Sequence, residues 1–219
     1  CNYNFVAEGT FTLSGDNGVV KDVALYDTPS FRAIVSSGTG AVIEDNYLGL
    51  LADGSDPGNG ERIGHGVEIT GGSSTIRGLV INRFSYDGVY LTSNGGNTIE
   101  GNYIGTDDTG TTDLGNSGSG VYVYSSPGNT IGGSSPGTGN LISGNDYNIS
   151  EWTTGNGVML YQADGNTVIG NYIGTDITGT VSIGNEREGV SIANCSNNTV
   201  GGNGSGEGNL ISGNSRRGV

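Results

Sequence analysis

The strongest constraint on this chain is an internal repeat. The segment Asn97–Gly133 recurs at Asn166–Gly202, shifted by 69 residues without a gap. From Asn97 to Asn145, 28 of 49 positions are identical to their partners 69 residues further on. Self-similarity at a fixed period is the signature of architectures that stack repeating units. An antiparallel sandwich would show no such long-range register, so the repeat favours a solenoid over that alternative.

Each repeat contains three short stretches that are typical of strands: G-V-x-[IVL], [ST]-[IV]-x-G and N-x-I-x-G. Within the first, Val121 and Val123 face one way and Tyr122 the other, which is the alternation of a strand. A unit of this size cannot bury its apolar face alone, so successive units must stack. The 44 glycines suit the many tight turns of such a stack. Stacking predicts one interior row of valines: Val67, Val89, Val121, Val158 and Val190.

We expect a single domain over residues 1–219. Residues 41–219 carry regular coils with polar loops, whereas residues 1–40 carry a degenerate form of the pattern. The chain stops partway through another G-V unit, which predicts that it is a segment of a longer protein. The degenerate part still contains strand-like pieces, at 11–13, 19–25 and 31–35.

The motifs NTIxGNYIGTDxTGT, GNLISGN and G-V-x-[IV] resemble those of right-handed parallel β-helix repeat proteins in the pectin-lyase-like superfamily. The resemblance covers residues 41–219 well and 1–40 loosely. It implies an all-β fold, a right-handed single-stranded parallel β-helix with three sheets and about seven coils. It is specific for the fold only, because the same coil carries lyases, hydrolases, epimerases, adhesins and stalks. It also implies a stack of asparagines at one bend, for which the candidates are Asn102, Asn140, Asn171 and Asn209.

The formal net charge is −14, from 22 acidic and 8 basic side chains. A chain this acidic should repel nucleic acid, and no apolar run is long enough for membrane insertion. Cys1 and Cys195 should lie about seven coils apart in the stack, which is too far for a disulfide. A sequence poor in Cys and Lys and rich in Asn, Gly and Thr resembles bacterial secreted or surface proteins. We therefore expect a secreted or cell-surface location.

Stacking brings residues one coil apart to within about 4.7–4.9 Å, so columns of side chains can form sites. His65, the single histidine, should lie beside Asp87, and such a pair could act as general acid or base. The G-H-G around His65 is similar to that of polygalacturonases, although the aspartates and the R-x-K site of that family have no counterpart here. Arg62, near the acidic loop 53–61, could instead be the base of a pectate-lyase-like β-elimination. The alternative to catalysis is that His65 only occupies a turn and that Arg62 forms a solvated ion pair with nearby acids.

Tyr90 and Tyr122 should lie one above the other on the outward face of the G-V-x-I sheet, with Glu68 in the same column. Exposed aromatic rings can stack on sugars, so these three are candidate substrate-binding residues. The alternative is a tyrosine ladder that only stabilises the sheet. Other tyrosines recur at equivalent places, which suggests a structural role because an active site is needed once: Tyr47, Tyr103 and Tyr172.

Asp107, Asp108 and Asp176 lie in the two GTDxTG turns. Hard cations bind where several oxygens converge, and these turns could supply carboxylates, hydroxyls and carbonyls to Ca²⁺. The alternative is that Asp107 and Asp176 cap their own turns through hydrogen bonds to the backbone. Nothing in the pattern requires a cofactor.

The polar groups repeat from coil to coil, and the sequence holds no complete catalytic set. We therefore expect a structural or adhesive β-helix module and favour a role other than catalysis. The alternative is a polysaccharide lyase, a glycoside hydrolase or a carbohydrate-binding module that uses the outward face of the G-V-x-I sheet. A polysaccharide or cell-wall glycan is the expected partner. Unpaired strand edges at the ends of the stack could also permit end-to-end self-association.

Overall fold

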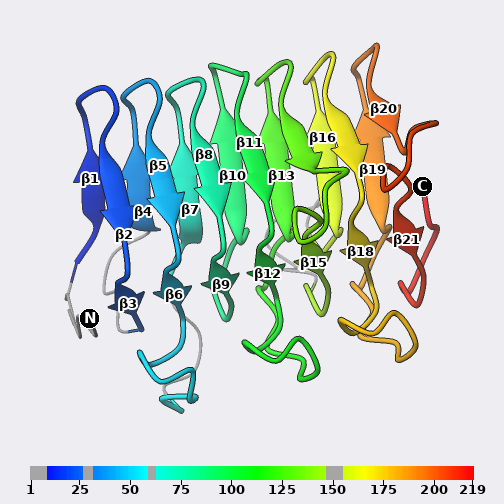
Figure 1. Cartoon of the computed structure of the whole chain (residues 1–219), viewed down its shortest axis with the longest axis horizontal. Helices are drawn as coiled ribbons and strands as arrows, with labels where there is room; N and C mark the ends of the chain where they lie inside the picture. Colours follow the sequence, from blue (N-terminus) through cyan, green and yellow to red (C-terminus); the bar gives the residue numbers. More distant parts are fainter. Residues whose placement is uncertain (1–8, 27–31, 59–62, 147–154) are drawn as a thin grey trace.

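The computed structural model describes residues 9–26, 32–58, 63–146 and 155–219. These residues form 21 strands and no helix, so they also contain no helix long and apolar enough to cross a membrane. The strands join three parallel sheets of seven strands each, and every third strand along the chain enters the same sheet. Figure 1 shows the coils stacked along one axis, from the first in blue to the last in red. The predicted all-β parallel β-helix is confirmed.

The three sheets are named 1, 2 and 3 in the order in which each coil passes through them. Sheet 1 contains the G-V-x-[IVL] stretches, in β1 (Phe11–Leu13), β4 (Arg32–Ser36), β7 (His65–Ile69), β10 (Val89–Thr92), β13 (Val121–Tyr124), β16 (Val158–Tyr161) and β19 (Val190–Ala193). Sheet 2 contains β2 (Val19–Lys21), β5 (Val42–Glu44), β8 (Thr75–Arg77), β11 (Thr98–Glu100), β14 (Thr130–Gly132), β17 (Thr167–Ile169) and β20 (Thr199–Val200). Sheet 3 contains β3 (Ala24–Leu25), β6 (Tyr47–Leu48), β9 (Val80–Ile81), β12 (Tyr103–Ile104), β15 (Leu141–Ile142), β18 (Tyr172–Ile173) and β21 (Leu210–Ile211).

The interior of each coil is filled by aliphatic side chains that alternate with outward-facing residues along the strands. The predicted row of valines is confirmed, because all five pair in register on neighbouring strands of sheet 1 and are completely buried. Repeating similar side chains from coil to coil lets each layer pack on the next without a change of shape. The other two sheets add buried rows of their own: Ile76, Ile99 and Ile131 on sheet 2, and Ile81, Ile104 and Ile142 on sheet 3.

The G-V glycines of the sheet 1 strands from β7 to β19 lie at the corner where the chain comes close to sheet 3. At Gly120, a Cβ would collide with Ile142 Cγ2 and would lie 2.9 Å from the carbonyl oxygen of Gly157. Gly120 does not have a positive φ, so space rather than backbone conformation requires a glycine here. The same crowding recurs at the other G-V glycines, Gly66, Gly88, Gly157 and Gly189.

The bend between sheets 2 and 3 holds a stack of buried asparagines, as predicted. Asn140 Oδ1 accepts a hydrogen bond from the Asn102 backbone N–H at 3.0 Å. Asn140 Nδ2 donates to Asn171 Oδ1 at 2.8 Å and to the Ile99 carbonyl at 2.9 Å. These bonds satisfy backbone groups that the bend removes from the sheets. Leu79 interrupts the stack one coil earlier, where it packs into the core. The continuous part of this ladder comprises Asn102, Asn140, Asn171 and Asn209.

Two further asparagine ladders run along the other two bends, and sequence reasoning did not predict them. In both, the side-chain amide of one asparagine donates to Oδ1 of the next at 2.8–3.1 Å. All three corners of the β-helix are therefore held by the same hydrogen-bonded arrangement. The ladders comprise Asn97, Asn129, Asn166 and Asn198 between sheets 1 and 2, and Asn116, Asn145, Asn185 and Asn214 between sheets 3 and 1.

The described residues among the first 40, 9–26 and 32–40, join the same three sheets in spite of their degenerate sequence. Strand β1 pairs with β4, β2 with β5 and β3 with β6, all in parallel. The strand-like piece predicted over 19–25 is divided into β2 and β3. Asp22, between them, has a φ of 56°, in the left-handed region, which turns the chain from one sheet to the next. The piece predicted over 31–35 corresponds to β4, whereas residue 31 and Cys1 lie outside the described residues.

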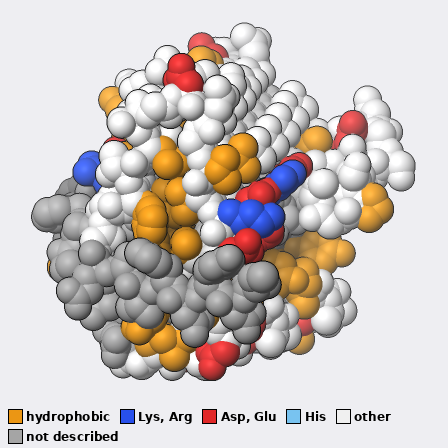
Figure 2. Space-filling view, turned by 60° about the vertical axis from the view of Figure 1, so that its left-hand side comes forward, with side chains coloured by type: hydrophobic (Ala, Val, Ile, Leu, Met, Phe, Trp, Pro, Cys, Tyr) orange, Lys and Arg blue, Asp and Glu red, His pale blue; other side chains and the backbone are white. Residues whose placement is uncertain are grey.

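Basic side chains lie directly against acidic ones, as Figure 2 shows for one face of the molecule. Lys21 Nζ lies 3.0 Å from Glu44 Oε1, and Arg77 pairs with the same carboxylate from the next strand of sheet 2. Arg83 forms a further pair with Asp56. Because these cations are used in pairs, the surplus acidic groups determine the charge of the surface, in line with the net charge of −14.

Candidate functional site

The structure brings His65 and Asp87 together, as the stacking of coils predicts. His65 Nδ1 lies 3.3 Å from Asp87 Oδ2, and the Asp87 backbone N–H also reaches Nδ1 at 3.3 Å. Asp87 is buried, and its Oδ1 accepts a hydrogen bond from the Ser119 backbone N–H at 2.8 Å. These contacts with Asp87 use Nδ1, so Nε2 is the nitrogen that could exchange a proton with a ligand. Arg62, the third catalytic candidate, lies outside the described residues.

An aromatic row continues from His65 along the outward face of sheet 1. The His65 and Tyr90 rings stack with centroids 4.8 Å apart and planes 15° apart. Tyr122 follows Tyr90 at 5.4 Å, but the two planes differ by 44°. The row goes on to Tyr124 and Tyr161, whose rings stack at 5.9 Å. Tyr90 and Tyr122 lie together as predicted, although their tilt lets a flat sugar ring stack on only one of them.

Burial affects the ionisable groups of this row, the Tyr122 phenol and the Glu68 carboxylate. Burial raises the pKa of Tyr122 far above its ordinary value, so the phenol stays neutral at any physiological pH. Glu68 lies in register with Tyr90, as predicted, but it is only 8% exposed and forms an ion pair with Arg32 of β4. A ligand that used the Glu68 carboxylate would have to displace the guanidinium of Arg32.

The three metal-ligand candidates do not converge on one point. Asp176 Oδ1 accepts hydrogen bonds from the Thr180 and Val181 backbone N–H groups, both at 3.0 Å. Its Oδ2 accepts one from Thr178 Oγ1 at 2.7 Å. The N–H of Val181 and the hydroxyl of Thr178 hold the pKa of Asp176 below its usual value. Across the described ranges no three His, Cys, Asp or Glu side chains are grouped to hold a metal ion.

Asp107 caps its own turn in the same way as Asp176. Its Oδ1 accepts from the Thr111 and Thr112 backbone N–H groups at 2.9 and 3.0 Å, and its Oδ2 accepts from Thr109 Oγ1 at 2.6 Å. Asp108 points instead toward Tyr47, with Oδ2 3.5 Å from the tyrosine hydroxyl. The capping arrangement that the sequence offered as the alternative to a cation site is therefore present in both turns.

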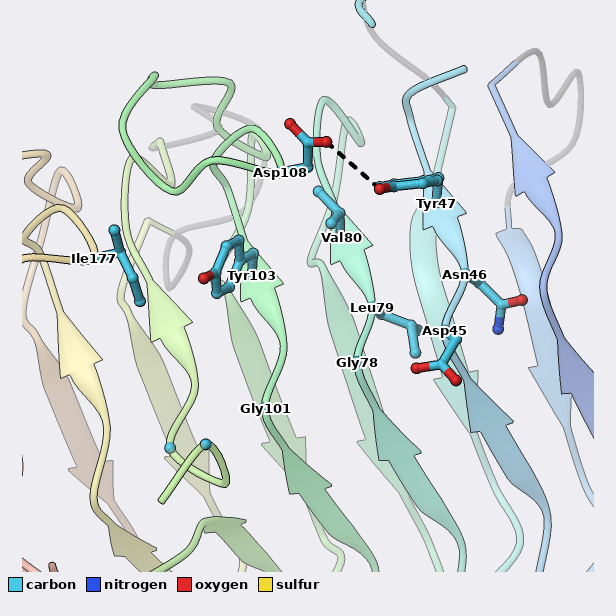
Figure 3. A pocket seen from close by; sticks show the side chains of 12 residues that line it. Asp45, Asn46, Tyr47, Gly78, Leu79, Val80, Gly101, Tyr103, Asp108 and Ile177 are labelled. Atoms are coloured by element: carbon cyan, nitrogen blue, oxygen red, sulfur yellow. Dashed lines mark hydrogen bonds between the residues drawn. The ribbon is translucent and has the colours of Figure 1, made fainter. Parts of the chain in front are cut away.

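A groove that sequence reasoning missed lies on the outward face of sheet 3 (Figure 3). It has a volume of about 530 Å³, and it is lined by Tyr47, Val80 and Tyr103 from three successive strands of that sheet. In Figure 3, Asp108 lies at one end of these strands and Gly101 toward the other, where the chain enters the sheet. Residues outside the strands, among them Asp108 and Ile177, complete the lining of the groove.

A second hollow adjoins the groove on the same face. It has a volume of about 560 Å³ and contains Tyr172 of β18. The two hollows share Gly137, Gly139 and Ile177 in their linings. The signal for this surface was present in the sequence as tyrosines at equivalent positions of three coils. Those tyrosines point outward, because the interior positions of the same strands are taken by leucine and isoleucine.

Comparisons with known proteins assign no family to the chain. No protein-family model matches it, and searches for similar curated proteins and similar solved structures found no significant match. Inferences about function therefore depend on the geometry of the surfaces described above.

Proposed function

We propose that the chain is a secreted or cell-surface β-helix module with a structural or adhesive role, and that it belongs to the pectin-lyase-like superfamily. The observation that carries this proposal is the repetition of its surface. Three asparagine ladders fix the corners of the coils, and aromatic side chains recur on the outward faces of sheets 1 and 3. A stiff frame with repeated contact groups suits a module that spans a distance or holds an extended partner.

A polysaccharide or cell-wall glycan is the partner that this proposal favours. Sugars present apolar C–H faces to aromatic rings and hydroxyl groups to polar side chains. The row from His65 through Tyr90 and Tyr122 offers rings at neighbouring coils, and it lies on the face that the sequence pattern singles out. The acidic surface and paired cations disfavour nucleic acid as a partner.

The second candidate function is a polysaccharide lyase or glycoside hydrolase. The observation that favours it is the contact between His65 and the buried carboxylate of Asp87. This contact orients the His65 imidazole through Nδ1, and the imidazole could act as a general acid or base. In this proposal Arg62 would supply the base for elimination. Cleavage would require these groups to act on a glycan held against the tyrosine row.

One experiment separates the two candidates. The chain is incubated with acidic and neutral polysaccharides, with and without Ca²⁺, and both product formation and retardation in an affinity gel are measured. We expect retardation without products, and several-fold weaker retardation for Tyr90→Ala, because a stacking ring is lost. Ser191→Ala, in the same column of sheet 1, is the control and should behave as the unaltered chain. Products that disappear in His65→Ala would overturn the adhesive proposal in favour of the enzyme.

A further inference from the structure

The tyrosines of sheet 3 are spaced at a fixed interval along the helix axis. Tyr47 and Tyr103 lie two strands apart with Val80 between them, and Tyr172 follows after two more strands, beyond Leu141. Neighbouring strands are about 4.7–4.9 Å apart, which places successive tyrosines about 9.5 Å apart. This interval is comparable with the disaccharide repeat of an extended 1,4-linked glycan. Rings at this interval match alternate sugars of a chain that would run parallel to the helix axis.

The side chains between and beside these rings fit the same ligand. Val80 lies between Tyr47 and Tyr103 in the lining of the groove, and the exposed Ile177 adds apolar surface to both hollows, whereas Leu141 is buried and lines neither. Asp108 Oδ2 accepts a hydrogen bond from the Tyr47 hydroxyl at 3.5 Å, and burial together with this carboxylate raises the pKa of Tyr47, so the phenol stays protonated. Asp45 adds a second carboxylate to the lining. Carboxylates accept hydrogen bonds from sugar hydroxyls, and rings stack on their C–H faces.

The acidic lining of the two hollows disfavours acidic glycans. Among the described residues that line the two hollows are Asp45 and Asp108 but no Lys, Arg or His, and Lys21 lies 3.2 Å from Asp45 outside the lining. The chain as a whole carries a net charge of −14. A polyuronate would bring a carboxylate on every sugar into this negative field, where Lys21 already pairs with Glu44 and Asp45. A neutral glycan meets no such repulsion.

The surface also disfavours an extended peptide. Peptides that bind to sheets usually add a strand to a free edge, where backbone N–H and C=O groups are unpaired. The groove lies on the face of sheet 3, and the strands that floor it, β6, β9 and β12, pair on both sides within the sheet. Their backbone groups are therefore not available to a peptide, whereas their outward side chains are available to a sugar.

We propose that the groove on sheet 3 binds an extended neutral glycan, with Tyr47, Tyr103 and Tyr172 as stacking platforms and Asp108 as a hydrogen-bond acceptor. This inference rests on the proposed adhesive role and deepens it by naming a site and a ligand class. The site differs from the tyrosine row on sheet 1, on which the sequence analysis centred. Binding here should depend on glycan length, because a chain must be long enough to reach two platforms.

The test is isothermal titration of the whole chain with neutral β-1,4-linked gluco-oligosaccharides, from disaccharide to hexasaccharide, and with oligogalacturonates as the anionic counterpart. We expect the hexasaccharide to bind most tightly and the oligogalacturonates at least tenfold more weakly. Tyr103→Ala should weaken hexasaccharide binding about tenfold. Thr130→Ala, on the outward row of sheet 2, is the control and should bind as the unaltered chain does.

A second variant and a second surface keep the test decisive. Tyr172 is 38% exposed, so Tyr172→Ala should fold even where Tyr103→Ala does not, and it should also weaken hexasaccharide binding. Undiminished binding in folded Tyr103→Ala and Tyr172→Ala would overturn the proposal, as would oligogalacturonate binding equal to that of the neutral series. Loss of binding in Tyr90→Ala alone would overturn the groove but retain the adhesive role. Absence of binding to every polysaccharide and oligosaccharide would overturn both.

Discussion

Replacing Asn140 with alanine is expected to destabilise the protein by about 3–5 kcal/mol, the cost of leaving two or three buried polar groups unpaired. Asn140 is only 2% exposed. Its side-chain oxygen accepts a hydrogen bond from the Asn102 backbone N–H, and its side-chain nitrogen donates to the Ile99 carbonyl and to Asn171 Oδ1. Alanine removes all of these partners at once and leaves the backbone groups of Asn102 and Ile99 without them at a buried position.

Urea unfolding of Asn140→Ala, followed by circular dichroism, measures this loss as a lower midpoint. Asn203→Ala is the matched control, because Asn203 is exposed and has an ordinary backbone conformation. Its effect should stay within about 0.5 kcal/mol, as for most surface substitutions. Equal midpoints for the two variants would mean that the ladder contributes nothing to stability, contrary to the hydrogen bonds described above.

Replacing Gly120 with alanine is expected to cost about 2–3 kcal/mol, as overpacking of a tight interior usually does. The added methyl group would meet Ile142 Cγ2 and would also lie 2.9 Å from both Asn145 Nδ2 and the Gly157 carbonyl oxygen. To relieve this steric clash, the corner of the coil would have to move away from sheet 3, and this movement would stretch the asparagine ladder at that corner. A single methyl group therefore acts on both the packing and the hydrogen bonds of one coil.

The measurement for Gly120→Ala is again the urea midpoint, with Gly208→Ala as the control. Gly208 has no atom within 4 Å of the position of a Cβ and no positive φ. Alanine there should be neutral or should stabilise by up to about 1 kcal/mol, because it reduces the entropy of the unfolded chain. A neutral result for Gly120→Ala would contradict the close approach of the coil corner to Ile142.

The fold could be predicted from the sequence because the same short sequence motifs recur in strand after strand. The valine row followed from the G-V pairs, and one asparagine ladder was implied by the resemblance to parallel β-helix repeat proteins. The other two ladders were missed although their members also recur at 69 residues, as Asn116 and Asn185 do, because the resemblance implied a stack of asparagines at one bend only.

The same reasoning explains which parts of the site were predictable. His65 and Asp87 are separated by 22 residues, the shortest interval between G-V units, so their contact followed directly from stacking. The groove on sheet 3 was missed because turns also line it, and the path of the turn at Asp108 depends on the hydrogen bonds of Asp107. Location outside the cell and end-to-end association stay predictions.

The most direct test of the account is whether the valines of sheet 1 form one interior row. Methyl nuclear Overhauser effects in a chain with labelled valines report which of them lie in neighbouring coils. The account predicts that Val121 contacts Val89 and Val158, each one strand away, but neither Val67 nor Val190. Contacts between Val121 and Val190, or no contact between Val121 and Val89, would contradict the stacking of coils on which every proposed site depends.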